Sequence, residues 1–234
     1  MFPLGSVLFP HMPIALRVFE DRYLVMLARV LDTDDPQFGV VLIEHGHETG
    51  GGDRRFRIGT MAHITEVSSG DDHVSLVARG GRRVEVLDWL EDDPHPVAIV
   101  RELPDFEWDD ALAAMHEEAE HIVRRTLART TEFAQTSWGA DVQLSDDPIE
   151  SAWQLAAIAP LGPIDQLALL QSGSPAELLT SLTALTLAAE PALTAAPADT
   201  EFDEAVAALL GFGEEPDEAA PGGGTGPDRP GAPS

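Results

Sequence analysis

The apolar pattern of this sequence changes its period near residue 104, and no single type of secondary structure accommodates both halves. Before that point, β-branched and other apolar residues alternate with polar ones, as they do in strands. From residue 105 onward, apolar residues recur at spacings of three and four, which is typical of amphipathic helices. The chain is therefore predicted to be α+β, with a β-rich domain over residues 1–104 and an α-helical bundle over residues 105–190.

The β-rich part is expected to contain one helix, within residues 19–36. Phe19 and Tyr23 begin its apolar stripe and are expected to anchor it on the sheet, while Arg17, Glu20 and Arg22 hold the segment by local hydrogen bonds. Strands are predicted at residues 38–46 and across residues 57–104, the latter broken at residues 68–72, at Gly80-Gly81 and at residues 92–94.

The second part is predicted to contain several helices joined by short links. In the first of them, two acidic residues at the start and arginines near the end suit the helix dipole. Pro163 and Pro175 stand where first-turn prolines are tolerated. The expected helices lie within residues 105–133 and at 148–159, 163–171 and 174–189.

Residues 191–234 are predicted to form a flexible acidic tail. From residue 213 to 234, eleven of the 22 residues are Gly or Pro, a composition typical of disorder. Before it, residues 200–213 are compatible with one short amphipathic helix carrying Phe202, Leu209, Leu210 and Phe212.

Charge and residue usage exclude several classes of function. The net charge is −27, and all fourteen basic residues are arginine. Without a lysine the chain cannot form a P-loop, a Schiff base or a Ser–Lys dyad. Its acidity disfavours nucleic acid and anionic membranes as partners. With no cysteine, no secretory signal and no apolar run near the ~18 residues of a membrane span, the chain is expected to be cytoplasmic.

The histidines do not indicate a metal site. His45 and His47 stand two apart, but their glycine-rich surroundings favour an exposed loop. His116 and His121 are five apart, so on a helix they point about 140° away from each other. No G-x-S-x-G motif is present. We predict no catalytic residue, no cofactor and no metal.

Two segments are candidates for binding a partner. Arg54, Arg55 and Arg57 flank Phe56 in the loop that follows residue 46, where they form a basic and aromatic spot that suits an acidic peptide. The short segment at 200–213, with Phe202, Leu209, Leu210 and Phe212, suits a partner's apolar groove or this chain's own bundle.

Several motifs resemble the Lon N-terminal (substrate-binding) domain family. "FPLGSVLFPHMPIALRVFEDRYLVML" is similar to its opening, with "R-x-F-E-x-R-Y" entering a helix. "IGTMAHITEV" resembles its "x-G-T-x-A-x-I" strand, and "LVARGGRRVEV" its "G-x-x-R-F-x-V" strand, with Val84 in place of phenylalanine. The helical half resembles the family's bundle over residues 156–182, with Asp165, Gln171 and Leu178 in place of lysine, glutamate and arginine. The likeness extends over residues 2–190.

The resemblance implies a PUA-like β pseudobarrel followed by a helical bundle. It also implies recognition of polypeptide substrate by a free-standing domain, since no AAA+ or peptidase domain fits in the residues that remain. We therefore expect a non-enzymatic polypeptide-binding module, such as an adaptor or regulator in protein quality control. The alternative is a small-molecule-binding or sensor protein, or an enzyme, that uses a barrel pocket. The sequence does not indicate an oligomeric state.

Overall fold

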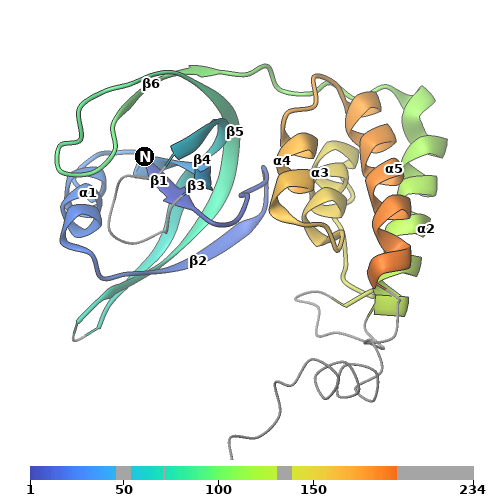
Figure 1. The fold of residues 1–234 in the computed structure, drawn as a ribbon, viewed down its shortest axis with the longest axis horizontal. Helices are drawn as coiled ribbons and strands as arrows, with labels where there is room; N and C mark the ends of the chain where they lie inside the picture. The colour runs from blue at the N-terminus through green and yellow to red at the C-terminus, as the bar shows by residue number, and fades with distance from the viewer. Residues whose placement is uncertain (46–53, 71, 131–138, 194–234) are drawn as a thin grey trace, which may run out of the picture. The chain divides into compact units, whose positions relative to one another are not determined.

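Six strands form one mixed sheet in this computed structural model, which describes residues 1–45, 54–70, 72–130 and 139–193 (Figure 1). The order along the sheet is β1-β3-β4-β5-β2, and β6 pairs with the other end of the long strand β5. Only the pairing of β1 with β3 is parallel. The strands are β1 (Phe2–Leu4), β2 (Pro13–Val18), β3 (Gln37–His45), β4 (Arg54–Ser69), β5 (Val74–Trp89) and β6 (Ala98–Glu102).

The prediction that Gly80-Gly81 breaks a strand is wrong, because both residues lie inside β5. The Gly80 amide donates to the Met12 carbonyl at 2.8 Å. A Cβ atom at Gly80 would overlap the carbonyl oxygen of Phe9. Glycine is therefore needed here because another backbone segment approaches β5 closely, not because the strand ends.

Helix α1 (Asp21–Leu31) follows β2, as predicted, and packs on the sheet through Tyr23, Met26 and Leu27. The Tyr23 ring stacks on Phe2 with centroids 4.2 Å apart, and the Arg22 guanidinium donates to Glu20 at 3.1 Å. Phe19 does not anchor the helix, because 58% of it is exposed. It precedes the first helical residue, so its side chain is not part of the helical stripe.

Among the described residues, four α-helices follow the sheet, and α5 packs along α2 and α3. The carboxylate of Asp147 accepts hydrogen bonds from the first two free amides of α3, those of Ile149 and Glu150, at 2.9 Å each. Prolines occupy the first turns of α3, α4 and α5, where their missing amide is harmless. The helices are α2 (Ala113–Thr130), preceded by a 3-10 turn at Asp110–Leu112, α3 (Pro148–Ile158), α4 (Pro163–Leu170) and α5 (Pro175–Leu193).

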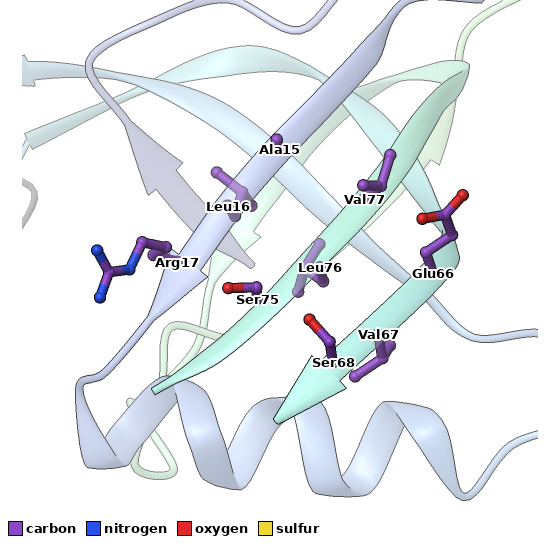
Figure 2. A pocket seen from close by; sticks show the side chains of 9 residues that line it. All are labelled: Ala15, Leu16, Arg17, Glu66, Val67, Ser68, Ser75, Leu76 and Val77. Atoms are coloured by element: carbon purple, nitrogen blue, oxygen red, sulfur yellow. The ribbon is translucent and has the colours of Figure 1, made fainter. Parts of the chain in front are cut away.

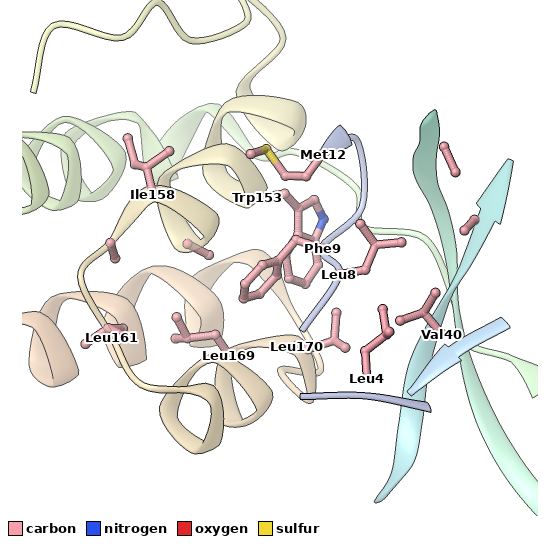
Figure 3. Close-up of a cluster of buried hydrophobic side chains, with 14 of the residues drawn as sticks. Leu4, Leu8, Phe9, Met12, Val40, Trp153, Ile158, Leu161, Leu169 and Leu170 are labelled. Atoms are coloured by element: carbon pink, nitrogen blue, oxygen red, sulfur yellow. The ribbon is translucent and has the colours of Figure 1, made fainter. Parts of the chain in front are cut away.

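One cluster of buried apolar side chains joins the sheet to the helices (Figure 3). Leu8 and Phe9, between β1 and β2, meet Trp153 of α3, and the Phe9 and Trp153 rings lie 6.0 Å apart. Phe106, in the link between the two parts, stacks on the Trp153 ring with centroids 5.0 Å apart. The core is therefore continuous across residue 104, the domain boundary that remains a prediction.

Candidate functional site

The basic and aromatic spot predicted at residues 54–57 lies in a strand, not in a loop, because β4 begins at Arg54. The Arg55 guanidinium lies 4.7 Å from the centre of the Trp89 ring and 3.8 Å from an Asp92 oxygen. It is thus engaged inside the chain, which reduces its availability to an acidic peptide. Phe56 is half-buried. Phe202, Leu209, Leu210 and Phe212 lie outside the described residues, and binding by either segment stays a prediction.

A shallow hollow of about 250 Å³ lies over three neighbouring strands, β2, β5 and β4 (Figure 2). Its nine lining residues form three cross-strand rows, such as Leu16, Leu76 and Val67. Of the two flanking rows, one contains Arg17, Ser75 and Ser68, and the other contains Ala15, Val77 and Glu66. The lining therefore mixes apolar and polar side chains, and it offers no uniformly apolar surface.

A larger and more apolar pocket, of about 660 Å³, lies between α1, β6 and the first residues of β3. Three methionines line it, Met1, Met26 and Met61, and their unbranched, polarisable side chains adapt to differently shaped apolar groups. Ala98 and Val100 of β6 form one wall. The sequence analysis missed this pocket because its methionines are spread over sixty residues and follow no motif.

One ion pair and one histidine–carboxylate contact stand at the rim of the methionine-lined pocket. The Arg29 guanidinium donates to the Asp93 carbonyl at 2.7 Å and contacts its carboxylate at 3.2 Å. A ring nitrogen of His63 lies 3.1 Å from a carboxylate oxygen of Asp35. The Arg29 charge is thus balanced by Asp93, and the Asp35 carboxylate adds to the strongly acidic character of the chain.

A third hollow, of about 410 Å³, lies where the sheet meets α3, beside Arg83. Arg83 is only 6% exposed, and burial lowers its pKa, which the nearby Asp105 carboxylate partly offsets. Its guanidinium donates to carbonyls of Leu170, Ser172 and Pro104. It also lies 4.3 Å and 5.0 Å from the ring centres of Phe106 and Trp153. Arg83 is therefore a structural clamp between β5 and the helices.

His11 lines the same hollow and holds an uncommon backbone conformation, with φ at 64°. It is the third residue of a tight turn that the Met12 amide closes on the Phe9 carbonyl at 3.3 Å. Its ring lies 3.2 Å from Glu150, which also contacts Arg79 at 3.5 Å. The polar groups of this hollow thus serve contacts between the sheet and α3.

The helices contain a serine–histidine contact that the sequence did not indicate. A ring nitrogen of His116 lies 3.0 Å from the Ser151 hydroxyl, and burial lowers the pKa of His116, while Glu120 and Glu117 oppose that shift. Ser151 is buried, and it lines with His116 a hollow of about 890 Å³. Within the described part of the chain, no group of three His, Cys, Asp or Glu is placed to hold a metal ion.

No helix in the described ranges has both the length and the apolar content to cross a membrane. A family model described as the ATP-dependent protease La (LON) substrate-binding domain matches residues 1–187. No curated protein matches this chain.

Solved structures similar to this one include two Lon N-terminal domains. The first is the crystal structure of a Lon N-terminal domain protein from Xanthomonas campestris, at 28% identity and a TM-score of 0.56, covering 78% of this chain and 95% of that one. The second is the N-terminal domain of the Mycobacterium avium complex Lon protease, at 18% identity and a TM-score of 0.57, covering 79% and 96%. The second likeness shows the fold alone.

Proposed function

The chain belongs to the Lon substrate-binding domain family, and we propose that it binds apolar segments of other polypeptides in the methionine-lined pocket. The single observation that carries this proposal is the pocket's lining, because three methionines, Ala98 and Val100 offer an adaptable apolar surface. Such a lining favours recognition of apolar character over recognition of one sequence. We propose that binding serves protein quality control, with the chain acting as an adaptor or regulator without catalysis.

We also infer that the sheet is a PUA-like pseudobarrel and that α2 to α5 form the family's helical bundle. One hollow supports the first inference, because it is lined by Phe2 and Leu4 of β1 and by Ala15 to Val18 of β2. These strands stand at the two ends of the sheet order, so the sheet must curl until its ends lie near each other.

The binding proposal is tested with a reduced, carboxymethylated protein that stays unfolded. We expect Val100→Asp to weaken binding at least tenfold, because a carboxylate would enter the apolar wall. Leu187→Asp on α5 is the matched control, since Val100 and Leu187 are 36% and 43% exposed. Equal binding by both variants and by the unchanged chain would exclude this pocket.

The proposal of a non-catalytic role has its own test. Purified chain is incubated with casein and ATP, and the casein is examined for fragments by mass spectrometry. We expect intact casein, because the chain has no lysine for a P-loop or a Ser–Lys dyad. ATP-dependent cleavage would refute it.

A further inference from the structure

We propose that the open edge of β6 binds a client polypeptide by strand addition, which places alternate client side chains in the methionine-lined pocket. This inference rests on the proposed function and specifies how the client is held. β6 pairs with β5 on one side, and no strand pairs with its other side among the described residues. Unpaired edges with free amides and carbonyls are the templates on which a further strand forms.

The hydrogen bonds at both ends of β6 identify which backbone groups point outward. The Leu103 amide donates to the Arg83 carbonyl at 2.9 Å, and the Leu90 amide donates to the Val97 carbonyl at 2.9 Å. Because bonding alternates along an antiparallel strand, residues with odd numbers in β6 face β5. The amides and carbonyls of Ala98 and Val100 therefore point to the open edge.

The same two residues line the methionine-lined pocket with their side chains. In a sheet, residues directly opposite each other on neighbouring strands project to the same face. Client residues opposite Ala98 and Val100 would therefore extend toward Met26 and Met61, while the residues between them face away. The edge would bind the client backbone, and the pocket would select apolar side chains at every second position.

This edge carries little protection against such pairing. Almost all of β6 is exposed, including Ile99 and Val100, and it contains no proline. Its two charged residues are engaged with the neighbouring strand, because Arg101 pairs with Glu85 and Glu102 with Arg82. Native edge strands are usually blunted by prolines or by unpaired charges.

Charge identifies the occupant. A second copy of this chain would bring another net charge of −27 to the interface, which opposes self-pairing. The Asp35 carboxylate at the rim and the acidity of the whole chain likewise disfavour an acidic segment. We therefore assign the edge to an extended, apolar and uncharged or basic stretch of a client polypeptide.

The test uses the full chain and a synthetic peptide that alternates valine and serine and ends in arginine. Two derivatives carry backbone N-methyl groups, one on every valine and the other on every serine. Strand addition needs only one of these sets of amides, so one derivative should bind about tenfold more weakly and the other nearly as well as the parent. Equal effects of the two methylation patterns would overturn the proposal.

Hydrogen exchange of the protein amides gives an independent readout. On adding the parent peptide, exchange at Ala98 and Val100 should slow at least tenfold, while Ile99 and Arg101, already bonded to β5, change little. No protection at Ala98 and Val100 would overturn the proposal. Protection already present without peptide would also overturn it, because a second copy or another part of this chain would then occupy the edge.

Failure of this inference is distinguishable from failure of the proposed function. If Val100→Asp abolishes peptide binding while the two methylated peptides bind equally, the pocket binds side chains without strand addition, and only the inference is wrong. If the parent peptide and the unfolded protein both fail to bind, polypeptide binding itself is refuted.

Discussion

The Arg83 guanidinium donates to the Ser172 carbonyl at 2.6 Å, although 89 residues separate them in the sequence. The same side chain donates to the Leu170 carbonyl at 3.0 Å. Both carbonyls stand at the end of α4, where helical carbonyls have no partner in their own helix. A strand residue thus completes the C-terminus of a helix in the other half of the chain.

Replacing Arg83 by alanine should therefore destabilise the protein by about 3 kcal/mol or more, because buried carbonyls lose their donors and two aromatic rings lose a neighbour. The stability of Arg83→Lys should lie between that of the unchanged chain and that of Arg83→Ala, since an ammonium group cannot reach three carbonyls as the planar guanidinium does. Urea unfolding measures both. An unchanged midpoint for Arg83→Ala would show that the clamp contributes nothing to stability.

Gly80 and Gly81 should respond differently to the same substitution. Gly80→Ala places a methyl group against the Phe9 carbonyl oxygen, which is backbone and cannot move aside easily. We expect a loss of roughly 1–3 kcal/mol. In Gly81→Ala the nearest atoms belong to the His63 side chain, which can shift, so the melting temperature should change little. Similar losses for both variants would contradict the close approach at Gly80.

Asp147 should stabilise the start of α3 as a helix cap. Asp147→Ala removes the acceptor for the amides of Ile149 and Glu150 and should cost about 1 kcal/mol. Asp147→Asn retains an acceptor oxygen and is the matched control. Thermal unfolding of the two variants should separate them, and an Asn variant as unstable as the Ala variant would argue against capping.

Stability should fall as the solution becomes acidic, in part through His116. Burial lowers its pKa in the folded state below the ordinary value of 6.5, so the unfolded chain binds the proton more tightly. Its contribution is complete above pH 6.5 and is lost as the pH falls below that value. His95, whose pKa burial also lowers, acts in the same direction.

The measurement is urea unfolding at about pH 7.5 and about pH 5.5. His116→Gln keeps a side chain that can contact Ser151 but cannot titrate, so the difference between the two midpoints should shrink without vanishing. A difference equal to that of the unchanged chain would show that His116 does not contribute.

Local patterns in the sequence were sufficient to predict most of the helices and the β-rich character of the first half. Tyr23, Met26 and Leu27 are buried at the spacings expected of α1, and the prolines at 163 and 175 start helices as predicted. The prediction that Phe19 anchors the helix is wrong, because an apolar residue two positions before the first helical residue still matches the apolar spacing of the helix in the sequence. The prediction of a strand break at Gly80-Gly81 is wrong because glycine is compatible both with a strand break and with the close approach of another backbone segment. Only the position of Phe9 in the fold distinguishes the two.

The sites depend on contacts that sequence spacing does not contain. Residues 54–57 were predicted to lie in a loop because glycines precede them, whereas the pairing of Arg54 and Arg55 with β3 makes this segment part of a strand. The methionine-lined pocket gathers Met1, Met26 and Met61 from separate elements. The clamp at Arg83 and the contact of His116 with Ser151 likewise join distant segments. Such long-range pairs are set by the sheet order and by the packing of the helices.

The shared core that joins Leu8, Phe9 and Trp153 has a practical consequence for anyone who dissects this chain. Dividing the chain at residue 104 would separate Trp153 from its aromatic neighbour Phe9 and would expose Leu8 to water. Each half would then expose an apolar surface that is buried in the intact chain. Such a fragment would bind many proteins non-specifically, for reasons unrelated to client recognition. Binding assays are therefore meaningful only on a chain that keeps both sides of this contact.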